Sequence, residues 1–74
     1  MIYETFCIRL KELRTSRNLT LKQLGAEIGI TESAVGSLEH GRRPVSLDTL
    51  VRIADYFNVS LDYLVGRSDK MERQ

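Results

Sequence analysis

Side chains that could carry out covalent or metal chemistry are scarce in this 74-residue chain. The one cysteine, Cys7, cannot form an internal disulfide, and it lacks the companions of a zinc-finger ligand set. Ser33, His40 and Asp48 supply the residue types of a hydrolytic triad, but a helical chain of this length has no room for the cleft that such a site needs. The sequence therefore predicts no enzyme, no bound metal and no cofactor.

Cys7 and His40 have structural interpretations instead. Cys7 lies beside Phe6 on an apolar helix face, where a buried and inert thiol is expected. His40 has no second histidine or nearby cysteine at metal-ligand spacing. We interpret it as a cation at a helix end or beside a phosphate.

Charge is the remaining source of chemistry. The 11 basic and 10 acidic residues leave a formal net charge of only +1, so any affinity for nucleic acid must come from where the basic residues lie. The first ten residues, MIYETFCIRL, include an acid and no long apolar run, which excludes a signal peptide. Because no segment reaches the roughly 20 apolar residues of a membrane helix, we expect a cytoplasmic protein without a membrane partner.

The elements that must position these residues are clearest between Thr20 and Leu38. Apolar residues at helical spacing indicate a helix that follows a capping box at Thr20. Gly25 inside this helix costs about 1 kcal/mol relative to alanine, so we expect a second helix to cross closely over it. Gly29 supplies a turn with positive φ, and Thr31 is the N-cap of the next helix. This layout is a helix-turn-helix, whose second helix is shaped to enter the DNA major groove.

Three further helices complete an all-α chain of about five short helices. They are predicted over residues 3–17, 46–57 and 60–65. The first ends near Asn18, which tolerates the left-handed conformation, and Asn58 closes the fourth. The fourth is expected to turn five apolar residues inward: Leu47, Leu50, Ile53, Ala54 and Phe57. Residues 1–68 are predicted to form one domain, and residues 69–74 a polar tail, with fraying expected from Arg67 onward.

The chain resembles the phage repressor/Cro-type helix-turn-helix regulators, also called the XRE family. The resemblance covers about Phe6 to Gly66 and rests on the segments LKELRTSRNLTLKQLG, SLEHGRRPVSLDTLVRIADYFNV and SLDYLVG, which occur in the family's order. It implies a lambda repressor-like fold that binds double-stranded DNA, with the helix from Thr31 to His40 in the major groove.

The resemblance also assigns roles by position. The residues implied to face base edges are Glu32, Ser33, Gly36 and Ser37. A serine hydroxyl can donate or accept at either base type, and Glu32 can accept from the amino group of cytosine. Equally, Glu32 can simply be a first-turn acid that favours the helix dipole. Because longer amides are absent from these positions, DNA shape is expected to contribute to recognition.

Phosphate contacts are predicted around that helix. The amide groups at the start of the second helix suit an anion, and arginines follow the first and third helices. The residues predicted to contact phosphates are Arg17, Thr20, Lys22, Gln23, Arg42 and Arg43. Their alternative role is that of ordinary solvated surface residues.

Two further assignments concern assembly. The family pairs an arginine of the first helix with a glutamate of the third, which implies a structural pair between Arg14 and Glu39. The short last helix carries more apolar residues than one inward face can bury, so an outward patch is predicted to form the interface of a homodimer. Its residues are Tyr56, Leu61, Tyr63 and Leu64.

The function that follows is that of a transcriptional regulator, and specifically a repressor that occludes a promoter. A symmetric dimer would bind an operator with inverted-repeat half-sites. The alternative is an antitoxin or antirepressor-like module that holds a protein partner and binds DNA weakly. No small-molecule ligand is expected for either function.

Overall fold

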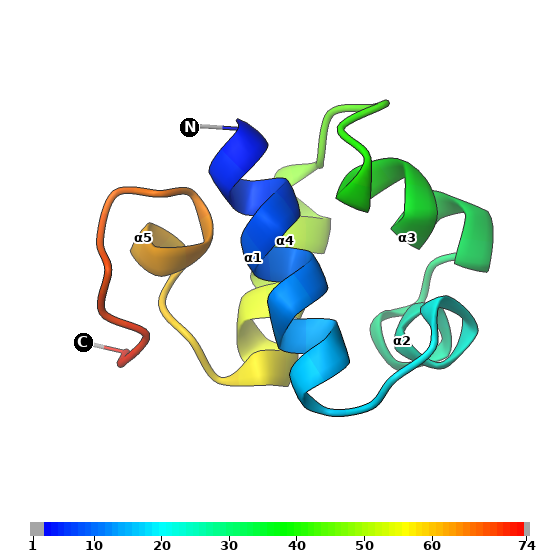
Figure 1. The fold of residues 1–74 in the computed structure, drawn as a ribbon, viewed down its shortest axis with the longest axis horizontal. Helices are drawn as coiled ribbons and strands as arrows, with labels where there is room; N and C mark the ends of the chain where they lie inside the picture. The colour runs from blue at the N-terminus through cyan, green and yellow to red at the C-terminus, as the bar shows by residue number, and fades with distance from the viewer. Residues whose placement is uncertain (1–2, 74) are drawn as a thin grey trace.

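The structure, a computed structural model, describes residues 3–73 and contains five α-helices in that range. They are α1 (Tyr3–Ser16), α2 (Leu21–Ile28), α3 (Glu32–Glu39), α4 (Leu47–Phe57) and α5 (Leu61–Leu64). Helices α1 and α4 run through the middle of the molecule, with α2 and α3 on one side and α5 with the following chain on the other (Figure 1). The predicted all-α bundle containing a helix-turn-helix is therefore confirmed.

Local sequence signals explain where the helices begin and end. Each helix from α2 to α5 follows a hydroxyl side chain that accepts a hydrogen bond from the backbone N–H three residues later. These N-caps are Thr20, Thr31, Ser46 and Ser60. Asn18 after α1 and Asn58 after α4 are left-handed, with φ of 57° and 55°. The four caps, the left-handed Asn18 and the end of α4 at Asn58 are as the sequence predicts.

One apolar cluster joins the five helices. Its fully buried side chains are Phe6, Leu10, Leu24, Val35, Ile53 and Leu64. The small domain depends on this single core, because a chain of this size has few other apolar contacts with which to offset the entropy of folding.

Gly25 permits a close backbone contact that differs from the helix crossing predicted from the sequence. A Cβ atom at this position would lie 2.6 Å from the carbonyl oxygen of Ile30. The group that excludes a side chain is thus the backbone of the α2–α3 turn, rather than a crossing helix. Gly29 within this turn has φ of 79°, as expected for the left-handed residue that ends α2.

Two predictions about the burial of apolar side chains are wrong. Leu47 is 74% exposed, because it is the first residue of α4 and the core-facing side of that helix begins one turn later, at Leu50. Tyr63 is only 7% exposed, and Leu64 is fully buried, so neither contributes to an outward patch. The Tyr63 ring is covered by the guanidinium of Arg9, whose Cζ lies 4.1 Å from the ring centroid.

The chain after α5 is not frayed, in contrast to the prediction. Arg9 donates hydrogen bonds to the carbonyl oxygens of Tyr63 and Ser68 and forms an ion pair with Asp69 at 3.0 Å. Further along, the N–H of Ser60 donates to the carbonyl of Met71 at 2.9 Å. Residues 67–73 therefore pack back onto the domain, while residue 74 of the predicted tail and residues 1–2 of the predicted domain lie outside the described part.

Cys7 is half-buried rather than buried. Its Sγ atom donates to the carbonyl oxygen of Leu38 at 3.2 Å, which links α1 to the end of α3. The thiol thus has a structural contact of the kind expected for an inert cysteine.

We predict that Gly25→Ala lowers the free energy of unfolding by about 1–3 kcal/mol, because the added methyl group displaces the α2–α3 turn. Chemical denaturation followed by circular dichroism measures this. Glu27→Ala is the matched control in the same helix, since Glu27 is exposed and its loss should change stability by less than about 0.5 kcal/mol. Equal stability of the two variants would contradict the proposed clash.

Candidate nucleic-acid interface

Helix α3 turns one face into the core and presents the other outward. Ala34, Val35 and Leu38 are buried against the rest of the domain. The two residues that open the helix, Glu32 and Ser33, are exposed. This arrangement leaves a polar surface on a helix that α2 supports along its inner side, since α2 and α3 pack closely together.

The four predicted base-reading residues all lie on α3. Glu32 and Ser33 are exposed, and Gly36 and Ser37 are half-buried. Within residues 3–73, the hydroxyl groups of Ser33 and Ser37 make no hydrogen bond, so both can still donate and accept. Ser33 and Ser37 have short side chains and Gly36 has none. These three positions can therefore contact a partner only if it approaches α3 closely.

The start of α2 offers donors for an anion. The hydroxyl of Thr20 accepts from the N–H of Gln23 at 3.0 Å, and the Gln23 side-chain oxygen accepts from the N–H of Thr20 at 2.9 Å. The Gln23 amide NH₂ group stays available. The next two backbone amides, of Leu21 and Lys22, have no hydrogen-bond acceptor within the described residues, as is usual for the first turn of a helix. This end of α2 therefore presents amide donors beside the exposed ammonium of Lys22.

The loop between α3 and α4 carries two exposed arginines. Arg42 and Arg43 make no side-chain hydrogen bond or ion pair inside the range 3–73. Gly41, at φ 68°, turns the chain out of α3, and the N–H of Arg42 donates to the carbonyl of Ser37 at 2.9 Å. The Nδ1 atom of His40 donates to the carbonyl of Gly36 at 2.7 Å, so this histidine is a helix-end residue, one of its two predicted roles.

Arg17, which was predicted to contact a phosphate, makes intramolecular contacts in this structure. Its guanidinium donates to the carbonyl oxygens of Tyr56 and Phe57 at 3.3 and 3.2 Å, and it lies over both of their rings. It thus compensates the unpaired carbonyls at the end of α4. The segment after α1 also lies at the opposite end of the molecule from the α3–α4 loop (Figure 1). We therefore leave Arg17 out of the proposed phosphate contacts.

The predicted pair between Arg14 and Glu39 forms and is largely buried. The Arg14 Nε and Nη2 atoms donate to the two carboxylate oxygens of Glu39 at 2.6 and 3.1 Å. The side chains are 14% and 4% exposed, respectively. The third donor, Nη1, bonds to the carbonyl of Leu19 at 2.7 Å. The hydrogen bond to Glu39 raises the pKa of the Arg14 guanidinium, and this outweighs the opposing effect of burial, so the guanidinium stays charged.

Other kinds of site find no support in the described range. Residues 3–73 contain no group of three or more histidine, cysteine, aspartate or glutamate side chains that could hold a metal ion. Over the same range, no helix is both long and apolar enough to cross a membrane.

Comparison with known proteins gives a consistent result. The sequence pattern of the family described as "Helix-turn-helix" matches residues 10–64. An uncharacterized HTH-type transcriptional regulator, YobD of Bacillus subtilis, is 40% identical over 93% of this chain and 65% of its own length. The transcriptional repressor RstR of the cryptic phage CTXphi in Vibrio cholerae is 36% identical over 89% of this chain and 59% of its own length.

A solved structure matches the fold as well. The restriction-modification controller protein C.AhdI from Aeromonas hydrophila superposes with a TM-score of 0.76 at 34% identity, over 84% of this chain and 94% of that one. The chain thus spans most of this structure but about three fifths of the two curated relatives named above.

We predict that Arg14→Ala lowers the free energy of unfolding by about 3–5 kcal/mol, because it strands the buried carboxylate of Glu39. Thermal denaturation of this variant is compared with that of Arg67→Ala, which removes an exposed arginine whose side chain makes no hydrogen bond within residues 3–73. Arg14→Lys should fall between the two, since lysine keeps the charge but cannot bond both carboxylate oxygens in the same planar way. Equal melting temperatures for all three would rule out a stabilising pair.

Proposed function

This chain belongs to the helix-turn-helix family, and from that membership we propose that it is a sequence-specific, double-stranded DNA-binding transcriptional regulator. We propose further that it acts as a repressor, by occupying a promoter and excluding polymerase. The 36% identity with a protein named as a phage transcriptional repressor supports that direction of regulation. A cytoplasmic location goes with this function and stays a prediction.

The arrangement of polar groups around α3 is the observation that carries the proposal. Exposed Glu32 and the unsatisfied hydroxyls of Ser33 and Ser37 provide groups that can contact base edges. The amides at the start of α2, with Lys22, and the two arginines of the α3–α4 loop provide phosphate contacts. Phosphate contacts fix the position of a protein on the duplex and base contacts select the sequence, so both kinds are needed in one surface.

Ion pairing explains how a chain with a net charge of +1 can present a basic surface. Four ion pairs form within residues 3–73: Arg9–Asp69, Arg14–Glu39, Arg52–Asp48 and Arg73–Asp55. Most of these acids belong to α4 and to the chain after α5. Lys22, Arg42 and Arg43 have no acid partner within that range, so their charge is available to phosphates.

An operator with two half-sites would require more than one copy of this domain. Recognition helices that read two half-sites on one face of the duplex are about 34–36 Å apart. The longest extent of this domain is 29 Å, so one copy cannot reach both half-sites. We therefore propose a homodimer on an inverted repeat, with one α3 helix in each half-site.

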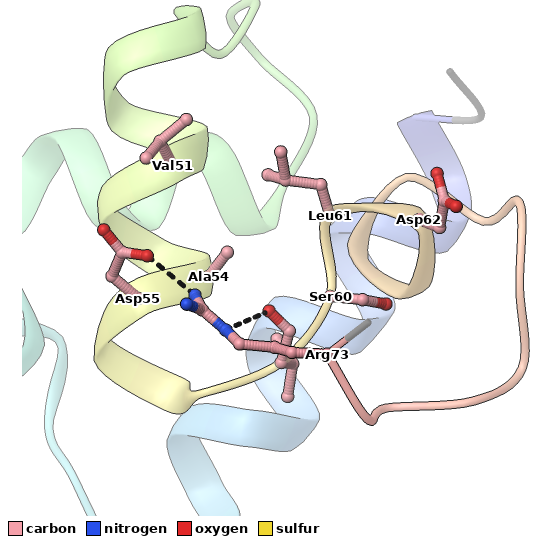
Figure 2. A pocket seen from close by; sticks show the side chains of 8 residues that line it. Val51, Ala54, Asp55, Ser60, Leu61, Asp62 and Arg73 are labelled. Carbon is pink, nitrogen blue, oxygen red and sulfur yellow. Dashed lines mark hydrogen bonds and ion pairs between the residues drawn. The ribbon is translucent and has the colours of Figure 1, made fainter.

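The proposed dimer face lies between α4 and α5. Val51 and Leu61 are 37% and 40% exposed and border a hollow of about 350 Å³ (Figure 2). The full lining is Val51, Ala54, Asp55, Val59, Ser60, Leu61, Asp62 and Arg73. Leu47 extends the apolar strip by one turn of α4. This face replaces most of the predicted one: Leu61 remains, Tyr63 and Leu64 are buried, and half-buried Tyr56 packs edge-on against Phe57.

A second copy fits this face because the rim carries both signs of charge. Arg73 and Asp55 form a pair at 2.7 Å on one edge of the hollow, and Asp62 lies on another. In a two-fold interface each group meets the same surface turned around, so an apolar centre with a mixed rim is self-complementary.

We predict that Arg43→Gln weakens binding to all duplexes alike and reduces the slope of log Kd against log salt by about one. Selection of bound duplexes from a random pool, followed by titration of the best sequence at several salt concentrations, measures this. Arg67→Gln, with the same charge change after α5, should leave the slope unchanged. Failure of the wild-type chain to select any sequence would refute the proposed function, and tight binding to a co-encoded protein instead would favour the antitoxin alternative.

We predict that Val51→Glu weakens dimer formation by about tenfold or more, because it places a charge in the apolar centre of the interface. Sedimentation of the protein with an inverted-repeat duplex should then show one bound copy where the wild-type chain shows two. Ile8→Glu is the control, since Ile8 is 59% exposed but lies on α1 outside the hollow. Two bound copies of both variants would exclude this face.

A further inference from the structure

The loop between α3 and α4 has little support from the residues beneath it. Residues 43–46 line one side of a hollow of about 90 Å³, and α3 lines another. Pro44 has no N–H group, and the N–H of Arg43 has no hydrogen-bond acceptor within residues 3–73. Contacts from below the loop therefore leave this part of its backbone weakly fixed.

Helix α1 contacts the loop at both of its ends. The first turn of α1 and the loop lie at the same end of the molecule (Figure 1), where the hydroxyl of Tyr3 accepts a hydrogen bond from the N–H of Val45 at 3.0 Å. One turn further along α1, the Sγ atom of Cys7 donates to the carbonyl of Leu38 and lies 3.5 Å from the place of a Cβ atom at Gly41. Residues four apart share one face of a helix, so a single face of α1 holds the chain where the loop starts and where it ends.

The two exposed arginines of the loop lie between these contacts. The backbone N–H of Arg42 bonds to the carbonyl of Ser37, which fixes the start of the loop. For residues 43–45, the bond from Val45 to Tyr3 is the one hydrogen bond made by a backbone N–H within the described range. The direction in which Arg43 leaves the domain therefore depends on Tyr3.

The Tyr3 hydroxyl should matter more for the position of the loop than for the stability of the domain. Tyr3 is 39% exposed, so water can take the place of its hydroxyl as the acceptor for the N–H of Val45. The net contribution of such a hydrogen bond to folding is small. Phenylalanine at this position would also keep the ring and its apolar contacts.

We propose that Tyr3 is a positioning residue for DNA binding, which holds the α3–α4 loop so that Arg42 and Arg43 are directed at phosphates beside α3. This inference rests on the proposed function and deepens it, because α1 carries none of the side chains proposed to contact DNA. An arginine on a weakly held loop loses more conformational freedom when it binds a phosphate. A loop that is already held in place by Tyr3 therefore binds more tightly.

The test is a double-mutant cycle on affinity for the selected duplex. Tyr3→Phe should lower the melting temperature by about 5 °C or less, and it should weaken binding by about three- to tenfold. The same change in a chain that carries Arg42→Gln and Arg43→Gln should weaken binding by less than about twofold, because the hydroxyl acts through those two arginines. Both cycles are measured at a salt concentration at which the arginine variant still binds. Hydrogen exchange of the Val45 amide should be faster in Tyr3→Phe than in the wild-type chain.

Tyr56→Phe is the matched control. It removes a hydroxyl that makes no hydrogen bond within residues 3–73 and lies on α4, so this variant should bind as the wild type does. Wild-type affinity of Tyr3→Phe would overturn the inference and leave the proposed function intact. An equal loss of affinity in both backgrounds would overturn it as well, since it would show a general structural effect. Unchanged exchange of the Val45 amide would contradict the contact itself without reference to DNA, whereas a wild-type chain that selects no duplex would refute the proposed function.

Discussion

The orientation of α3 depends on one buried ion pair. Arg14 bonds both carboxylate oxygens of Glu39 and the carbonyl of Leu19, so a single guanidinium joins α1, the α1–α2 connection and the end of α3. Such a pair need not add net stability over an apolar contact, because both charges lose their hydration. The pair instead fixes an orientation: its hydrogen bonds are satisfied in one geometry only, and that geometry sets the outward surface of α3 relative to α1.

The local parts of the fold follow from the sequence, because the signals for them lie within a few residues. Thr20, Thr31, Ser46 and Ser60 are N-caps as predicted, and Gly29 turns the chain where only glycine does so easily. The family resemblance added the Arg14–Glu39 pair, which joins residues 25 positions apart and has no local signal.

The errors arise where distant segments meet. Burial of Tyr63 depends on Arg9, which lies 54 residues earlier, and the docking of residues 67–73 depends on Arg9 and Arg73 together. Helical periodicity describes one helix at a time, so it placed Leu47 inward with the rest of its face, although the core does not extend to the first turn of α4. The proposed base and phosphate contacts are harder still to predict from the sequence, since they depend on a second molecule.

The docked chain after α5 has a consequence for anything attached to it. Residues 67–73 lie on the side of the molecule away from α2 and α3, and Arg73 borders the hollow between α4 and α5 (Figure 1, Figure 2). A polypeptide tethered after Arg73 would leave the domain beside the hollow and clear of α3. A group joined by a short flexible linker would therefore be held near the hollow at an effective concentration of about millimolar. A tandem fusion joined at this point would convert association of two copies into an intramolecular event.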